Sequence, residues 1–159
     1  MLFQRKAKKE ENSVKKLELL YPENVKINCK ADKKENVIRA VGQMLVDSGY
    51  VNQSYVDAMV KREESFSTYM GNELALPHGV EEAKKEIKAS GIAVMVFPEG
   101  TDWDGEQVKA VVGIAGVGEE HLKILSVVAE LALEDDFIER LVSASAQEVY
   151  EMLKGGEVA

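Results

Sequence analysis

The feature that most constrains the fold of this chain is an uninterrupted apolar run at residues 92–97, which follows Gly91 and is closed by Pro98. A second, mostly apolar segment occupies residues 108–115. A strand with one face in water alternates apolar and polar residues, whereas a strand buried on both faces is apolar throughout. A sheet of such strands needs helices on both sides, so these two segments predict an α/β fold.

Other segments carry apolar residues at helical spacing or in short extended runs. Three residues are suited to N-capping a helix, namely Asp32 (with Glu35 as its capping-box partner), Asn52 and Ser145. Further helices are expected at residues 81–88, 119–134 and about 136–141, and short strands at residues 25–28 and within 68–76. Together these elements predict a single domain with a mixed sheet of about four or five strands, flanked on both faces by about five or six helices.

Three individual side chains can also be assigned a place. Residues 100–105 are expected to form a loop, in which Trp103 would be a partly packed surface aromatic. Leu122 is expected on the buried face of the helix at residues 119–134. Cys29, the single cysteine, is expected to be a small buried residue, and it cannot form a disulfide within the chain.

Composition narrows the class of protein. The chain has 159 residues, which suits one domain, and its 28 acidic against 20 basic residues give a formal charge of −8. Nucleic acid is therefore not expected as a partner, because its binders neutralise phosphates with excess lysine and arginine. No apolar run approaches the ~20 residues that cross a bilayer, so we expect a cytoplasmic protein without direct membrane insertion.

The N-terminal segment differs in composition from the rest. Residues 1–16 are mostly charged and lack an apolar face, which predicts an arm or a linker stub, with the folded domain at residues 17–159. A membrane-binding basic arm is the alternative interpretation. It is less favoured because acidic residues interrupt the basic ones.

The two histidines, His78 and His121, each lie where a helix is expected to begin after a strand. Ligand sites collect at such positions in α/β folds, and helix N-termini attract anions. His78 follows Pro77 and precedes Gly79, an arrangement that would orient a neutral imidazole as a nucleophile. His121 would donate an N–H group to an anion on its neighbour, provided that Glu119 and Glu120 face elsewhere. The alternative for both is structural: a loop histidine that caps a turn, and a histidine satisfied at a helix start.

Other site chemistries find less support in the sequence. A zinc site needs three or four ligands, whereas the chain has no His-x-x-x-His or Cys-x-x-Cys pattern. Neither a phosphate-binding P-loop nor a Gly-x-Ser-x-Gly elbow is present. We therefore expect neither a metal nor a cofactor.

The residues around His78 resemble a known signature. Glu63, six further residues, and the segment Met-Gly-Asn-Glu-Leu-Ala-Leu-Pro-His-Gly at residues 70–79 are similar to the phosphorylation site of enzyme IIA domains. These domains form the mannitol/fructose class in the bacterial phosphoenolpyruvate-dependent sugar phosphotransferase system, and the mannitol type is most similar. The resemblance extends from about Leu17 to the C-terminus, through residues 91–93, 98–100, 112–115 and 120–122.

The resemblance implies a mixed sheet flanked by helices, and a phosphotransferase that needs no cofactor. It also implies that His78 accepts a phosphoryl group from the phosphocarrier HPr and passes it to a cysteine of a IIB domain, which serves a IIC permease for mannitol or a related sugar. His121 matches the family's second site histidine, and Arg62 matches an arginine near the phosphoryl group. Without the resemblance, the alternative for Arg62 is an exposed helix-end residue paired with Glu63 or Glu64.

Two other functions remain open at this point. A nitrogen-related or transcription-regulator module of the same family would use phosphorylation of His78 as a regulatory switch. An unrelated small-ligand binding domain would contain two structural histidines and would take up no phosphate.

Overall fold

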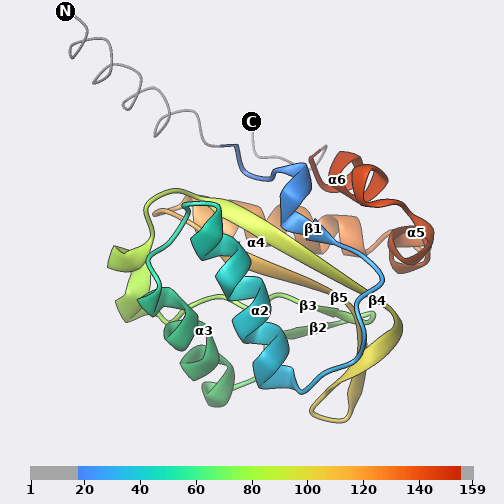
Figure 1. The fold of residues 1–159 in the computed structure, drawn as a ribbon, viewed down its shortest axis with the longest axis horizontal. Helices are drawn as coiled ribbons and strands as arrows, with labels where there is room; N and C mark the ends of the chain where they lie inside the picture. Colours follow the sequence, from blue (N-terminus) through green and yellow to red (C-terminus); the bar gives the residue numbers. More distant parts are fainter. Residues whose placement is uncertain (1–17, 155–159) are drawn as a thin grey trace, which may run out of the picture.

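The computed structural model describes residues 18–154, which form one five-stranded mixed sheet with helices on both faces (Figure 1). The strand order is β1-β4-β5-β3-β2. The antiparallel pair β4 (Gly91–Trp103) and β5 (Glu106–Ala115) forms the centre, and β1 (Val25–Lys26) runs parallel to β4 on one side. On the other side, β3 (Leu74–Ala75) runs parallel to β5, and β2 (Tyr69–Gly71) is antiparallel to β3 at the edge. The predicted α/β fold is confirmed.

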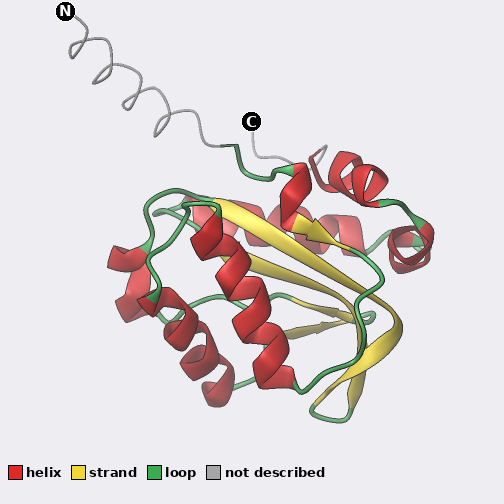
Figure 2. Ribbon diagram, viewed as in Figure 1, coloured by secondary structure: helices red, strands yellow, loops and turns green. Residues whose placement is uncertain are grey.

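Five α-helices and two short 3-10 helices surround the sheet (Figure 2). One face is covered by α2 (Lys34–Asp47) and α3 (Ser54–Ser65), and the other by α4 (Glu120–Ala132), α5 (Phe137–Ser143) and α6 (Ala146–Lys154). The 3-10 helices are η1 (Pro22–Asn24) and η2 (Glu81–Glu86). These five α-helices and two 3-10 helices are those of residues 18–154.

The packing of β4 against two cores explains why its sequence does not alternate between apolar and polar residues. Ala93, Met95 and Phe97 belong to the core beneath α2 and α3, whereas the intervening Ile92 and Val94 belong to the core beneath α4, α5 and α6. All five side chains are nearly or fully buried. The prediction of strands buried on both faces is confirmed.

The predicted loop at residues 100–105 is wrong. Strand β4 continues through Pro98 to Trp103, with a register shift between Val96 and Thr101 that accommodates the proline, which lacks an N–H group. The hairpin turns at Asp104 and Gly105, whose φ angles of 56° and 93° suit a tight two-residue turn. The Asp-Gly dipeptide is a recognised signal for such a turn, so this hairpin was detectable in the sequence.

The predicted N-caps are correct at one helix out of three. Ser145 Oγ accepts a hydrogen bond from the Glu148 N–H group, and the Glu148 carboxylate accepts one from Ser145 N, which is a capping box. The N-caps of α2 and α3 are instead Lys33 and Gln53, without side-chain caps. The side chains predicted to cap them turn elsewhere: Asp32 accepts hydrogen bonds from Lys33 N and the Asn36 amide, and Asn52 donates to Glu86.

Three smaller expectations also need correction. Leu122 is 69% exposed, because α4 turns Ile124 and Val128 into the core instead. Cys29 is only partly buried. The helix expected at residues 81–88 is a 3-10 helix, Glu81–Glu86.

The predicted arm at residues 1–16 lies outside the described residues. Within residues 18–154, none of the helices combines the length and the apolar character that spanning a membrane requires.

Candidate active site

His78 extends the line of β3 beyond the end of that strand. The Ile114 N–H group donates a hydrogen bond to the Pro77 carbonyl at 2.9 Å, and His78 forms an isolated parallel bridge with Ile114 of β5. The Nδ1 atom of His78 lies 2.8 Å from the carbonyl oxygen of Leu76. A carbonyl oxygen can only accept, so this contact places the ring proton on Nδ1 and leaves the lone pair on Nε2.

Tyr55 of α3 holds the turn that follows His78. Its hydroxyl accepts a hydrogen bond from the Gly79 N–H group and donates one to the carbonyl of Ile114, both at 2.9 Å. The ring leaves no room for a side chain at residue 79, because a Cβ atom there would lie 2.5 Å from it. Burial raises the pKa of Tyr55 to about 12, so the hydroxyl keeps its proton. Sequence analysis did not identify Tyr55 as a site residue, because its two partners are distant in the sequence.

His121, in the first turn of α4, lies beside His78 with 5.1 Å between the ring centroids. Gly116 permits this placement, because a Cβ atom there would lie 2.3 Å from the His121 Cα. Glu120 accepts a hydrogen bond from the hydroxyl of Ser90, which itself accepts one from Val117 N. The neighbouring carboxylate is thus held by Ser90, as a role for His121 in anion binding requires.

Arg62 lies in the last turn of α3 and contributes to the same pocket. Its guanidinium donates a hydrogen bond to the Phe66 carbonyl at 2.9 Å and lies 4.2 Å from the centroid of the Phe66 ring. Among the described residues it forms no ion pair with Glu63 or Glu64, which was the alternative interpretation. The contacts with Phe66 hold Arg62 without neutralising its charge.

Glu63 and Trp103 form a buried network beneath the end of α3. The Glu63 carboxylate accepts hydrogen bonds from Thr68 N at 2.9 Å, Thr68 Oγ1 at 2.6 Å and Trp103 Nε1 at 3.0 Å, and Lys34 Nζ lies 3.6 Å away. Trp103 is fully buried, so its prediction as a surface aromatic is wrong. The network fixes the helix end that presents Arg62.

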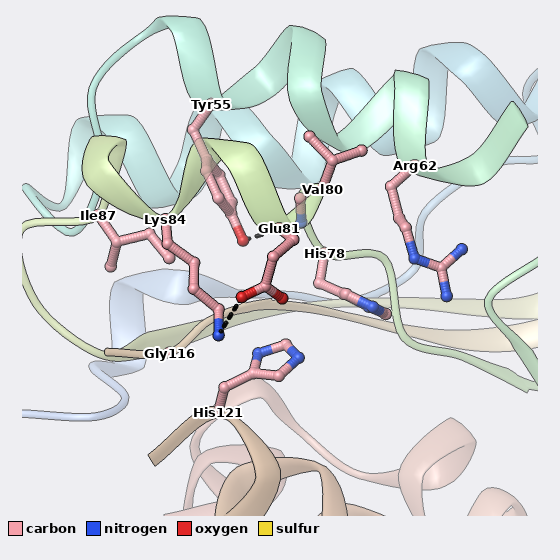
Figure 3. A pocket seen from close by; sticks show the side chains of 10 residues that line it. Tyr55, Arg62, His78, Val80, Glu81, Lys84, Ile87, Gly116 and His121 are labelled. Atoms are coloured by element: carbon pink, nitrogen blue, oxygen red, sulfur yellow. Dashed lines mark hydrogen bonds and ion pairs between the residues drawn. The ribbon is translucent and has the colours of Figure 1, made fainter. Parts of the chain in front are cut away.

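The three predicted site residues, His78, His121 and Arg62, line one pocket of about 190 Å³ (Figure 3). In the view of Figure 3, His78 lies between Arg62 and His121. Tyr55, Lys84 and Glu81 are further lining residues that sequence analysis did not select. The signal for Glu81 and Lys84 was their place just after the His78 motif, in the segment predicted as a charged helix.

Both imidazoles favour their neutral form. Burial lowers the pKa of His78, and the positive charge of Arg62 adds to this effect. Burial likewise lowers the pKa of His121, with a further contribution from His78. The sequence predicts a neutral imidazole at His78, and burial is the largest cause that favours this form. A pair of neutral imidazoles supplies one nucleophilic nitrogen and a donor N–H group.

The charge arrangement of the pocket lining suits an anion. Within residues 18–154, no group of three or more His, Cys, Asp or Glu side chains is placed to hold a metal. Phosphoryl transfer passes through a loose state with charge on three equatorial oxygens, which fixed cationic and N–H donors stabilise. Arg62 and His121 are donors of this kind on either side of a potential nucleophile.

Comparison with known proteins agrees with this chemistry. A family model described as phosphoenolpyruvate-dependent sugar phosphotransferase system, EIIA 2, matches residues 18–156, which is nearly the whole chain. The chain belongs to this family. It is therefore an enzyme IIA component of a sugar phosphotransferase system, and its activity is that of a phosphotransferase.

The individual relatives of this IIA component have names that specify a sugar alcohol, which the family description does not. The mannitol-specific phosphotransferase enzyme IIA component of Halalkalibacterium halodurans is 50% identical over 141 residues, covering 88% of this chain and 96% of the relative. That of Bacillus subtilis is 47% identical over 133 residues, covering 83% and 93%. Among solved structures, this chain is similar to the mannitol enzyme IIA of Escherichia coli in its complex with phosphorylated mannitol enzyme IIB, with a TM-score of 0.80 and 36% identity. The match covers 87% of this chain and 99% of that one.

Proposed function

We propose that this IIA component carries phosphoryl groups for mannitol uptake on Nε2 of His78. The observation that carries this assignment is the contact between His78 Nδ1 and the Leu76 carbonyl, which leaves Nε2 as the nucleophile. Arg62 and His121 line the same pocket and supply donors for the phosphoryl oxygens. The mannitol-specific relatives support the transport function over a nitrogen-related or transcription-regulator module.

The first step is acceptance of the phosphoryl group. Nε2 of His78 forms the new bond to phosphorus while the bond to the donor atom of phosphorylated HPr breaks, and the bonding electron pair leaves with that donor atom. The proton stays on Nδ1, which donates it in a hydrogen bond to the Leu76 carbonyl, so this contact stabilises the positive charge formed on the ring. Arg62 and His121 bind the equatorial oxygens as their negative charge is redistributed.

The second step passes the group onward. A cysteine thiolate of the IIB domain forms a bond to phosphorus as the bond to His78 Nε2 breaks, and the electron pair returns to the imidazole. The solved complex of a mannitol IIA with phosphorylated IIB supports this partner. The other partners that we propose are HPr, as the phosphoryl donor, and the IIC permease of the same system. We propose that this IIA component acts in the cytoplasm.

The test is transfer of labelled phosphate from phosphoenolpyruvate through enzyme I and HPr. We expect one acid-labile phosphate on His78 of the wild-type chain and none on His78→Ala. A chase with the mannitol IIB domain should remove the label, whereas a purely regulatory module would retain it. Full labelling of His78→Ala would refute the assignment of this residue.

We also propose that residues 17–159 are the functional domain and that residues 1–16 are dispensable for transfer. The family match to residues 18–156 supports this boundary. A chain lacking residues 1–16 should accept phosphate at the wild-type rate. A loss of transfer without a loss of stability would place part of the function in the removed segment.

A further inference from the structure

The pocket contains a second cation, Lys84, that the mechanism above does not use. Lys84 lies in the last turn of η2, and its Nζ is 2.9 Å from the carboxylate of Glu81 in the first turn. Both side chains line the pocket with His78. Figure 3 shows the pair beside His121, on the opposite side of His78 from Arg62.

The two members of this pair differ in exposure. The Glu81 side chain is 79% exposed and that of Lys84 is 44% exposed. An ion pair this exposed adds little to stability, so it can open at little cost. Glu81 has open solvent into which to turn, whereas Lys84 is the more enclosed of the two.

The net charge of the pocket lining suits a phosphoryl group only in part. Two cations and one carboxylate, namely Arg62, Lys84 and Glu81, give the lining one net positive charge. A phosphorylated side chain carries about −1.5 to −2 charge near pH 7. The Glu81 carboxylate would repel this group, and its departure would leave two positive charges to match it.

We propose that Lys84 is a catalytic residue that binds the phosphoryl oxygens on His78, and that Glu81 holds its ammonium in the pocket until the phosphoryl group arrives. As the bond from His78 Nε2 to phosphorus forms, the Lys84 ammonium exchanges the carboxylate for a phosphoryl oxygen and Glu81 turns into solvent. In this exchange no proton is transferred, and no further covalent bond forms or breaks. The inference rests on the proposed function of His78.

The Lys84–Glu81 pair also lies next to His121 in the pocket. Burial lowers the pKa of His121, and the positive charge of Lys84 adds to that effect while the carboxylate of Glu81 opposes it. The ammonium therefore lies close enough to act on a ring that itself contacts the ring of His78.

The inference makes opposite predictions for the two partners. Lys84→Gln removes the positive charge, so it should slow transfer from phosphorylated HPr and shift the transfer equilibrium back toward HPr. Glu81→Gln removes a repulsive charge and releases the ammonium, so it should shift the equilibrium toward the phosphorylated chain. A salt bridge that serves only to stabilise η2 would give the same, small effect for both.

The experiment measures the rate and equilibrium of phosphate transfer from phosphorylated HPr, with thermal unfolding of each variant as a check on folding. Lys85→Gln is the matched control, because Lys85 is exposed on the same short helix and is not part of the pocket lining. We expect Lys84→Gln to slow transfer about tenfold, less than the roughly 100- to 1,000-fold for a buried oxyanion donor, because Lys84 is half exposed. Lys84→Arg, which keeps the charge, should stay within a few-fold of wild type.

Equal rates and equilibria for Lys84→Gln and Lys85→Gln, with His78 labelled normally, would overturn the inference and leave the proposed function intact. A shift of Glu81→Gln in the same direction as Lys84→Gln would also overturn it. Failure of the wild-type chain to take label on His78 would instead refute the proposed function itself. If Lys84→Gln does not fold, Lys84→Arg and Glu81→Gln decide the question.

Discussion

Tyr55→Phe tests whether the position of His78 depends on one buried hydroxyl. The substitution keeps the ring that packs on Gly79 and removes only the oxygen that joins Gly79 N to the Ile114 carbonyl. A lost hydrogen bond costs about 1 kcal/mol, and each buried partner left unsatisfied costs about 1–3 kcal/mol. With Gly79 partly exposed, we expect a loss of about 2–3 kcal/mol in the free energy of unfolding. The midpoint of thermal unfolding should then fall by roughly 5–10 °C for a chain of this length.

The functional part of this prediction needs a matched control. Tyr50→Phe is suitable, because Tyr50 is also buried and its hydroxyl donates at 2.6 Å to the carbonyl of Glu18, away from the pocket lining. Both variants should lose stability. Only Tyr55→Phe should slow phosphate transfer, by about tenfold, since small displacements of a reacting group are costly.

Nitrogen-15 NMR of the His78 ring provides a direct readout of position. In the wild type, we expect the proton on Nδ1, bound to the Leu76 carbonyl. In Tyr55→Phe the turn is released, and the ring nitrogens should shift toward a mixture of tautomers. Equal transfer rates and unchanged ring shifts in the two tyrosine variants would refute the claim that Tyr55 positions His78.

Three further predictions concern stability and pH. Glu63→Ala should lower the free energy of unfolding in urea by about 3–5 kcal/mol, because it leaves the buried Trp103 N–H and both Thr68 donors without a partner; a loss below about 1 kcal/mol would contradict this. Gly116→Ala should displace α4 through the 2.3 Å clash with His121, so thermal unfolding should occur at lower temperature and transfer should slow, whereas full activity would show that the backbone relaxes freely. Because burial depresses the pKa of His78 and His121 in the folded state, their contribution to stability is complete above about pH 6.5, the unfolded value, and is lost as the pH falls through the folded values. Phosphate acceptance should follow the neutral form, with its midpoint below pH 6.5; a midpoint above that value would contradict the depressed pKa.

Local sequence signals predicted most of the secondary structure. The unbroken apolar run of β4 indicated burial on both faces, and alternate residues do enter the two cores. The Ser145 capping box was predictable because its partners are three residues apart. The errors at residues 100–105 arose because Pro98 was taken as the end of a strand that accommodates it at a register shift.

The site was predictable only in part, because local signals do not mark contacts between residues that are distant in the sequence. The residues around His78 form one contiguous motif, the place of His121 at an expected helix start marked it as a candidate, and the family resemblance added Arg62. The supporting contacts join distant positions: 40 residues separate Glu63 from Trp103, and 24 separate Tyr55 from Gly79. Nothing in local periodicity marks such pairs.

By itself, the sequence determined that this chain builds a doubly covered sheet and presents a histidine after a Pro-containing turn, because apolar patterning and turn chemistry act over a few residues. Tertiary structure alone decided that two histidines 43 positions apart lie with their rings 5.1 Å from each other, and that Arg62 and Lys84 share their pocket. Packing brings these groups together, and burial among them, rather than any local signal, sets the lowered pKa of His78.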